Sequence, residues 1–230
     1  MSTPQLPLGL AFPRDQRLDT YRGAVPGLLE MLGGIASGMA PGAFLAGPDG
    51  SGRSHLLLAA CAEAAAHGRS VVYLPLRSFG ARAASALADQ GRVQLACVDD
   101  VQAIAGWREA EVALFDLHNR VRDGGGALLY AADASPALLP LVLPDLRSRL
   151  AQSAQFALIA PDEPLRRDIL RQRASARGLE LDDAVVDYLF RHADRDLASL
   201  TALLDRLDRA SLAAQRRITV PFLKDVIGAS

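Results

Sequence analysis

The sequence predicts an α/β protein in which a parallel-sheet domain is followed by a small all-helical domain. Up to Pro161, short apolar runs alternate with amphipathic segments. Each run is too short for a buried helix, and such alternation is typical of parallel strands joined by crossover helices. Beyond Pro161, apolar residues recur only at helical spacings of three and four. A chain of 230 residues is long enough for one sheet domain and an appended helical domain.

The expected elements follow one another along the chain. A helix is expected over 26–39, where Leu28, Leu32 and Ile35 recur at helical spacing. The runs expected to form strands are 43–46, 70–74, 93–98, 127–132 and 156–159. The later helices are expected over 163–176, 183–192 and 197–213, with a short last turn over 221–227. We therefore expect a proline-rich extended arm over 1–24, a sheet domain over 25–161 and a helical domain over 162–230.

Composition limits the function classes. The chain has 25 Lys+Arg against 26 Asp+Glu and a formal net charge of -1, which argues against binding nucleic acid mainly by neutralising phosphates. Cys61 and Cys97 lie in apolar runs and no basic leader precedes a cleavage site, so a reduced, cytosolic compartment is expected. No apolar stretch reaches the roughly 18 uncharged residues of a membrane span.

A glycine-rich segment over 47–54 has the spacing of a phosphate-binding loop, between an expected strand and an expected helix. Glycines let the backbone aim successive N–H groups at a phosphate chain, and the following helix adds its positive end. The alternative is a glycine-rich turn without a ligand. The residues expected to bind nucleotide here are Gly47, Pro48, Asp49, Gly50, Ser51, Gly52, Arg53 and Ser54. The Ser54 hydroxyl is the expected ligand of Mg²⁺.

Arg53 stands where this motif has a lysine. A planar guanidinium is bulkier than an ammonium group and cannot be placed as the same compact point charge against the phosphates. We therefore expect nucleotide binding to survive and hydrolysis to suffer.

The apolar run over 93–98 ends in two carboxylates, Asp99 and Asp100. Ligands collect at the carboxyl ends of the strands of a doubly wound sheet, so we expect Asp99 to hold Mg²⁺ through water, with Asp100 beside it. Acidic residues also cap helices, so the pair alone does not indicate a metal site. The nearby phosphate loop favours the interpretation as a metal site. As a base that activates water, Asp100 is one methylene shorter than the glutamate of many such enzymes, which again indicates slow turnover.

With these motifs in order, the chain resembles the AAA+ ATPases of the DnaA initiator clade, and more closely its regulatory members, from Gln5 to Ile227. The resemblance implies an AAA+ base domain followed by a helical lid. It implies an adenine nucleotide as cofactor, ADP in preference to ATP, together with Mg²⁺. The stretch around Leu18 and Tyr21 resembles the segment that lies over the adenine, with a plain linker as the alternative. Asp133 corresponds to the polar sensor on the γ-phosphate side.

The segment over 143–150 resembles the one that carries the family's arginine finger, with Arg149 at the finger position. The resemblance implies action in trans, on the nucleotide of a neighbouring protomer. The alternative is that Arg147 and Arg149 merely solvate a helix surface. In the lid, one register puts the second sensor arginine at Arg195, and another puts Ala198 there.

The amino-terminal arm resembles the short peptide by which family members dock on the replication sliding clamp. Leu6 and Leu8 would enter an apolar pocket while the Gln5 amide makes directional hydrogen bonds. The expected clamp-binding residues are Gln5, Leu6, Pro7, Leu8 and Leu10. Because the sequence ends at Ser230, soon after the lid, we expect no helix-turn-helix and no direct sequence-specific DNA binding.

Together with these features, the resemblance implies a negative regulator of replication initiation. It would dock on the DNA-loaded clamp in the nucleoid and stimulate hydrolysis of ATP bound to the DnaA initiator, with weak or absent turnover of its own. One alternative is a self-sufficient P-loop ATPase such as a helicase loader. Another is a clamp-binding adaptor whose nucleotide site is only structural. The sequence leaves self-association open.

Overall fold

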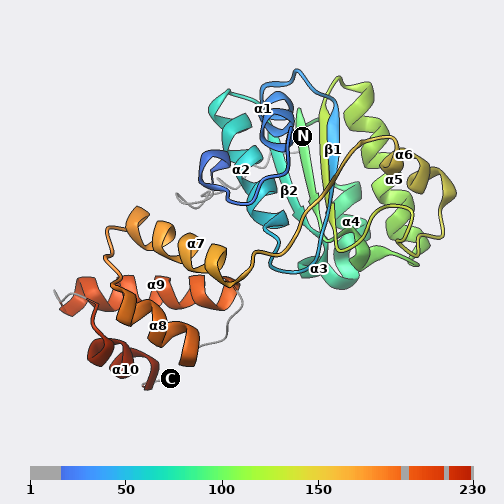
Figure 1. Ribbon diagram of the computed structural model, residues 1–230. Helices are drawn as coiled ribbons and strands as arrows, with labels where there is room; N and C mark the ends of the chain where they lie inside the picture. The colour runs from blue at the N-terminus through green and yellow to red at the C-terminus, as the bar shows by residue number, and fades with distance from the viewer. Residues whose placement is uncertain (1–16, 193–196, 215–217, 229–230) are drawn as a thin grey trace, which may run out of the picture. The chain divides into compact units, whose positions relative to one another are not determined.

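The computed structural model describes residues 17–192, 197–214 and 218–228. The chain divides into two compact units, a first through Leu158 and a second from Ile159 (Figure 1), with the loop residues Pro48–Ser51 grouped with the second. Within the described residues, no helix is both long enough and apolar enough to cross a membrane.

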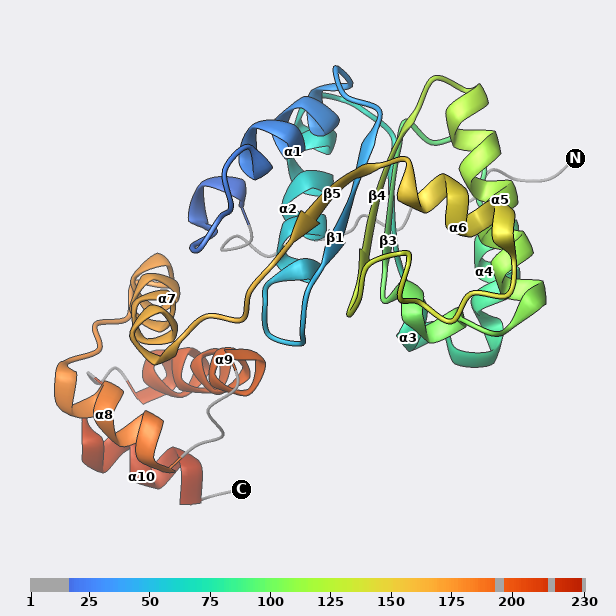
Figure 2. The same cartoon turned by 45° about the vertical axis from the view of Figure 1, so that its right-hand side comes forward.

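A five-stranded, wholly parallel sheet forms the centre of the first unit, which confirms the predicted fold class. Its strands lie in the order β2-β3-β4-β1-β5, of which Figure 2 labels β3, β4, β1 and β5. Their bounds are β1 Gly42–Ala46, β2 Val71–Pro75, β3 Leu95–Asp99, β4 Ala127–Ala132 and β5 Ala154–Ala157. The last strand begins two residues earlier than expected, because pairing with β1 sets Ala43 opposite Ala154. Ile159, which the apolar run had included, is 80% exposed.

Two helical layers cover the sheet. Alternate strand residues point to opposite faces, so Ala43 and Leu45 pack with one layer while Phe44 packs with the other. The first layer is α1 Leu28–Ser37 and α2 Arg53–Ala66. The second is α3 Leu76–Phe79, α4 Ala83–Ala88, α5 Arg108–Asp123 and α6 Pro144–Ala151. Short 3-10 turns are η1 Leu18–Thr20, η2 Gly80–Arg82 and η3 Val101–Ile104.

The strand order determines where a ligand can bind. β1 and β4 are neighbours, but the chain leaves β1 toward β2 and leaves β4 toward β5, on opposite sides. In open parallel sheets, such a change of direction opens a crevice at the carboxyl ends of the two strands. The loop after β1 and Asp133, which follows β4, lie at this point.

The residues before α1 differ from the expected extended arm. Arg17–Tyr21 include the 3-10 turn η1, and Leu18 is buried against the layer of α1 and α2. This anchoring fixes the last part of the arm beside the start of α2.

Four helices make up the second unit and enclose a core of their own. They are α7 Glu163–Ala176, α8 Asp183–His192, α9 Leu197–Ala214 and α10 Val220–Gly228. Asp162 caps α7, since its side chain accepts a hydrogen bond from the Leu165 N–H at 2.9 Å. Leu170, Phe190 and Leu204 are among the side chains that meet in the core. All four elements match the helical pattern of the sequence.

Candidate functional site

The loop over 47–54 joins the end of β1 to the first turn of α2, in the strand–loop–helix context that the motif requires. Gly50 and Gly52 have φ angles of 79° and 90°, in the left-handed region that only glycine adopts without strain. The Gly47 N–H donates to the Ala132 carbonyl at 3.1 Å, which ties the loop to the end of β4. The N–H groups of the first turn of α2 have no intrahelical acceptor, as at any helix N-terminus, and such groups suit an anion.

Tyr21 lies directly against this loop. A Cβ atom on Gly52 would come within 2.6 Å of the Tyr21 Cε2 atom, so the ring and the loop backbone are in close contact. The Tyr21 and His55 rings are 5.8 Å apart, and His55 Nε2 lies 3.1 Å from the Arg17 carbonyl oxygen. Leu18 and Tyr21, expected near the adenine, are thus brought to the start of α2.

Arg53 is the first residue of α2, and its side chain is only 6% exposed. Its Nη1 donates to the carbonyl oxygen of Gly47 in its own loop, and its Nη2 lies 3.9 Å from Asp100 Oδ1. The guanidinium therefore holds the loop and the acidic strand end together. A lysine, with a single charged nitrogen, could not span both groups in this way.

The two carboxylates at the end of β3 have different surroundings. Asp99 is 1% exposed; its Oδ1 accepts from the Asp100 N–H at 2.9 Å, and its Oδ2 accepts from the Tyr73 hydroxyl at 2.8 Å. Burial and the Asp99 charge raise the pKa of Tyr73, which therefore stays protonated and donating. Asp100 has a φ of 55°, and among the described residues no other non-glycine has a positive φ.

Asp100 faces two cations. Arg77 Nη2 lies 3.4 Å from Asp100 Oδ1, the oxygen that Arg53 also approaches. Burial and the neighbouring Asp99 raise the pKa of Asp100, whereas Arg77, Gln102 and Arg53 oppose the rise.

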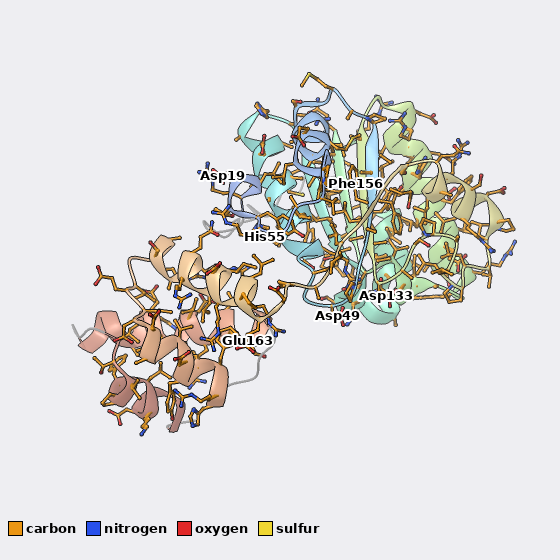
Figure 3. All side chains as sticks on the ribbon, viewed as in Figure 1. Asp19, Asp49, His55, Asp133, Phe156 and Glu163 are labelled. Carbon is orange, nitrogen blue, oxygen red and sulfur yellow. The ribbon has the colours of Figure 1, made fainter. Side chains whose placement is uncertain are left out.

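Gln102 is a site residue that the sequence did not reveal. Its side-chain amide donates to Asp100 Oδ1 at 2.9 Å and accepts from the Asp133 N–H at 3.2 Å. One glutamine thereby joins the carboxyl ends of β3 and β4, where Figure 3 shows Asp133. Sequence reasoning had no signal for it, because the two ends become neighbours only in the folded sheet.

The chemistry of the donor set fits Mg²⁺. The Tyr73 hydroxyl donates to Asp99 Oδ2 at 2.8 Å, and Ser54 is near enough to lower the pKa of the same hydroxyl, so both expected ligands lie near Tyr73. The described residues contain no group of three or more Asp, Glu, His or Cys side chains that could hold a metal alone. A magnesium ion here would need phosphate oxygens and water as its remaining ligands, which is its usual habit.

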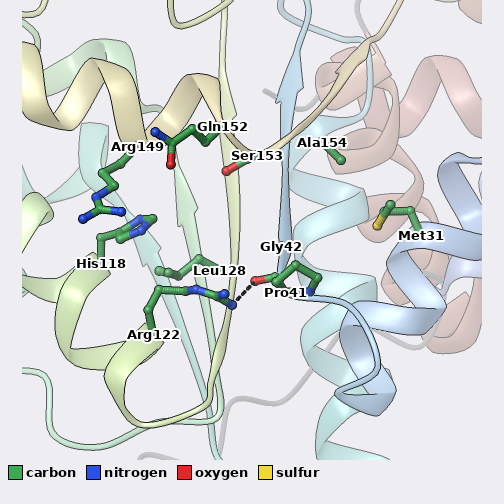
Figure 4. Close-up of a pocket in the computed structure, with 10 residues that line it drawn as sticks. All are labelled: Met31, Pro41, Gly42, His118, Arg122, Leu128, Arg149, Gln152, Ser153 and Ala154. Carbon is green, nitrogen blue, oxygen red and sulfur yellow. Dashed lines mark hydrogen bonds between the residues drawn. The ribbon is translucent and has the colours of Figure 1, made fainter.

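Arg149 lies at the other end of the sheet. It belongs to α6 and is exposed, and it borders a hollow of about 270 Å³ (Figure 4). Gly42, Leu128 and Ala154 line the same hollow near the amino ends of β1, β4 and β5. The structure therefore does not bring Arg149 to the phosphate loop of its own chain.

The hollow also contains His118, whose Nδ1 lies 2.8 Å from the Tyr130 hydroxyl. Burial, followed by the charges of Arg149 and Arg122, lowers the pKa of His118 to about 4. The imidazole is therefore neutral at pH 7, and two cations lie close enough to influence it.

Glu111 is fully buried in α5 and holds the chain before α6. Its carboxylate accepts from the N–H groups of Gly106, Val142 and Leu143 at 2.7, 3.1 and 2.7 Å. Sequence reasoning missed it, because an acidic residue in a first helical turn is ordinary. Glu111 thus positions the helix that carries Arg149.

Some expected site residues lie outside the described part of the chain. These are Arg195 and the clamp-binding residues Gln5, Leu6, Pro7, Leu8 and Leu10. Ala198, the alternative to Arg195, belongs to α9.

The sheet order, the phosphate loop after β1 and the helical second unit define the class: this is an AAA+ protein with a base and a lid. Residues 35–157 match the bacterial DnaA ATPase domain, and residues 163–227 match the lid domain of Hda. The first match spans more than half of the chain, which therefore belongs to the DnaA family, with a lid of the Hda type. Membership links it to replication initiation.

Solved structures share the fold. Domain III of the Thermotoga maritima replication initiation protein DnaA has a TM-score of 0.74 and 20% identity, covering 95% of this chain and 98% of that one. AMPPCP-bound DnaA from Aquifex aeolicus has a TM-score of 0.66 and 21% identity, covering 87% and 67%. A Thermotoga maritima RuvB mutant has a TM-score of 0.62 and 16% identity, covering 95% and 72%.

Proposed function

We propose that this protein holds an adenine nucleotide on residues 47–54 and presents Arg149 in trans to ATP on a DnaA-type initiator, whose hydrolysis it stimulates. The observation that carries the proposal is the separation of Arg149 from the loop. The loop follows the carboxyl end of β1, whereas Arg149 lies near the amino ends. A strand of five residues spans about 16 Å, so Arg149 serves a nucleotide other than its own.

The proposed reaction is hydrolysis of the bond that joins the terminal phosphate to the rest of the partner's ATP. A water oxygen forms a bond to the terminal phosphorus as the bond to the bridging oxygen breaks, giving ADP, inorganic phosphate and a proton. Negative charge grows on the phosphoryl and bridging oxygens, and a guanidinium placed against them stabilises that charge. Arginine fingers accelerate such reactions by about 10³ to 10⁵.

The chain's own nucleotide has a supporting role in this proposal. Arg53 is bound to the Gly47 carbonyl and lies near Asp100, so it is a tether rather than a mobile charge for a γ-phosphate. Asp100 is surrounded by Arg53, Arg77 and Gln102 and is poorly placed to activate water. These contacts favour resident ADP, with Mg²⁺ held by Ser54 and Asp99, and little turnover.

Clamp docking through Gln5, Leu6, Pro7, Leu8 and Leu10 completes the proposal. A chain of formal charge -1 has little electrostatic hold on DNA, so work at DNA calls for a tether. The proposed site of action is the DNA-loaded sliding clamp, with the initiator as second partner and no sequence-specific DNA contact. Deleting residues 1–10 should abolish clamp binding; undiminished binding would remove this part of the proposal.

The central test is phosphate release from ATP-bound DnaA with DNA-loaded clamp and this protein. Arg149→Ala should lower the stimulated rate by about 10³-fold. Arg147→Ala, on the same helix, is the matched control, since its Nη2 only donates to the Leu141 carbonyl at 2.8 Å. Equal stimulation by wild type and Arg149→Ala would overturn the finger role.

A second candidate is a self-sufficient P-loop ATPase such as a helicase loader. The proximity of Ser54 and Asp99 to the Tyr73 hydroxyl favours it, because that arrangement suits a magnesium-dependent site. The purified chain decides between them: sustained ATP turnover without DnaA supports this candidate, whereas ADP that copurifies and is never turned over supports the first.

A further inference from the structure

The hollow beside Arg149 is positively charged and has no carboxylate in its lining (Figure 4). Arg149 comes from α6 and Arg122 from the last turn of α5; Figure 4 shows His118 between them, with the Arg122 side chain extended toward the Pro41 carbonyl.

Arg122 and Arg149 both have N–H groups without a carboxylate partner among the described residues. Elsewhere in the described residues, Arg77, Arg167 and Arg177 each pair with a carboxylate. Arg122 instead donates from Nη1 alone, to the carbonyls of Pro41 and Gly126, both at 3.3 Å.

Arg149 has no hydrogen bond or ion pair to any residue that the structure describes, nor does Arg122 have an acidic partner there. The Nε and Nη2 groups of Arg122 and the whole guanidinium of Arg149 therefore remain for a ligand. Five donors in a fixed fork on each side chain suit oxygen anions.

His118 lies in the electric field of both arginines. Apart from burial, the groups that lower its pKa to about 4 are Arg149 and Arg122. Both guanidinium groups therefore act electrostatically on one imidazole ring, which Figure 4 shows between them. An anion between them would relieve their mutual repulsion.

We infer that this hollow is a phosphate-binding site in which Arg122 acts beside Arg149, and that its ligand is the terminal phosphate of the nucleotide on the partner. The inference rests on the proposed function and adds a second residue to it. One arginine fork already matches the two oxygens of a carboxylate. Two guanidinium groups match the larger number of oxygens on a phosphate chain, where charge grows as the bond to the bridging oxygen breaks.

The first experiment measures stimulated hydrolysis of DnaA-bound ATP by Arg122→Gln. We expect a rate about 10- to 100-fold below that of wild type, as for the loss of one charge-assisted hydrogen bond. Arg108→Gln is the matched control, because Arg108 is an exposed arginine at the opposite end of α5. Binding of ADP to the variant's own loop should be unchanged. Stimulation at the wild-type rate by Arg122→Gln overturns the inference.

The second experiment needs no initiator. The imidazole of His118 is followed by nuclear magnetic resonance while ADP-saturated protein is titrated with inorganic tripolyphosphate. An anion between the arginines should raise the pKa of His118 by about 1 in the wild type, and by much less in Arg122→Gln or Arg149→Ala. No change in the wild type overturns the inference.

The two readouts separate the inference from the proposed function. Stimulation that depends on Arg149 but not on Arg122 leaves the proposed function standing and removes the inference. No stimulation by wild type, together with a response of His118 that depends on Arg122, removes the proposed function and supports a phosphate site in the hollow.

Discussion

Replacing Glu111 by alanine removes one carboxylate that satisfies three backbone N–H groups. The side chain is fully buried, and it accepts from Gly106, Val142 and Leu143 at 2.7, 3.1 and 2.7 Å. A buried donor left without an acceptor costs about 1–3 kcal/mol. Allowing for some access of water after local rearrangement, three such donors should lower the free energy of unfolding by about 3–6 kcal/mol.

Glutamine at position 111 provides a graded comparison. Its amide oxygen can replace Oε1 and keep the bonds from Gly106 and Val142, but its NH₂ group would face the Leu143 N–H, donor against donor. We expect Glu111→Gln to cost about 2 kcal/mol, because one of three bonds and the charge are lost.

The assay is urea unfolding followed by fluorescence. Trp107 is the single tryptophan of the chain, and its carbonyl accepts the Glu111 N–H at 3.0 Å, so its emission reports unfolding of the first unit. Glu109→Ala, an exposed change in the same helical turn, should shift the free energy of unfolding by less than about 0.5 kcal/mol. A loss below about 1 kcal/mol for Glu111→Ala would refute the view that this carboxylate holds the entry to α6.

Three further predictions concern other residues. Gly52→Ala places a Cβ atom 2.6 Å from the Tyr21 ring at a φ of 90°, and it should weaken nucleotide binding by about tenfold or more in calorimetry. Gly50→Ala is the control, because its Cβ would have nothing within 4 Å and the variant bears only the strain of its φ. Tyr73→Phe removes a 2.8 Å hydrogen bond to a buried carboxylate and should cost about 1.5–3 kcal/mol in urea unfolding; an unchanged midpoint would contradict this. His118 has a pKa of about 4 when folded and about 6.5 when unfolded, so the unfolded chain takes up the proton first as pH falls. The stabilisation is full above about pH 6.5 and is lost toward pH 4, with a fall of about 2 kcal/mol between pH 7 and pH 5 that His118→Gln should largely abolish.

Local signals in the sequence predicted most of the fold. The phosphate loop needs glycines at fixed positions, and the spacing of apolar residues indicates the strands and the lid helices. These elements could therefore be located from the sequence alone. The bounds of β5 could not, because the apolar run continues to Ile159, which lies beyond the strand and is 80% exposed. Only the hydrogen-bonded register with β1 fixes that strand.

The contacts that organise the site lie beyond the reach of local reasoning. Tyr73 meets Asp99 because β2 and β3 pair side by side, and Gln102 joins Asp100 to Asp133 because β3 and β4 do. Arg122, 27 positions before Arg149, shares a hollow with it only after α5 and α6 have packed on one face of the sheet. Strand order and helix packing, rather than residue type, create these neighbours.

The placement of the nucleotide loop and Arg149 at opposite ends of the same strands gives any assembly built on them a polarity. A contact between Arg149 of one subunit and the nucleotide of another joins two different surfaces. Such a contact is head-to-tail and does not close by two-fold symmetry. A row of such subunits has one end that offers a nucleotide and another that offers an arginine. In the proposed assembly, the subunit at the nucleotide end would act on a single neighbour, and its own nucleotide would face away from that reaction.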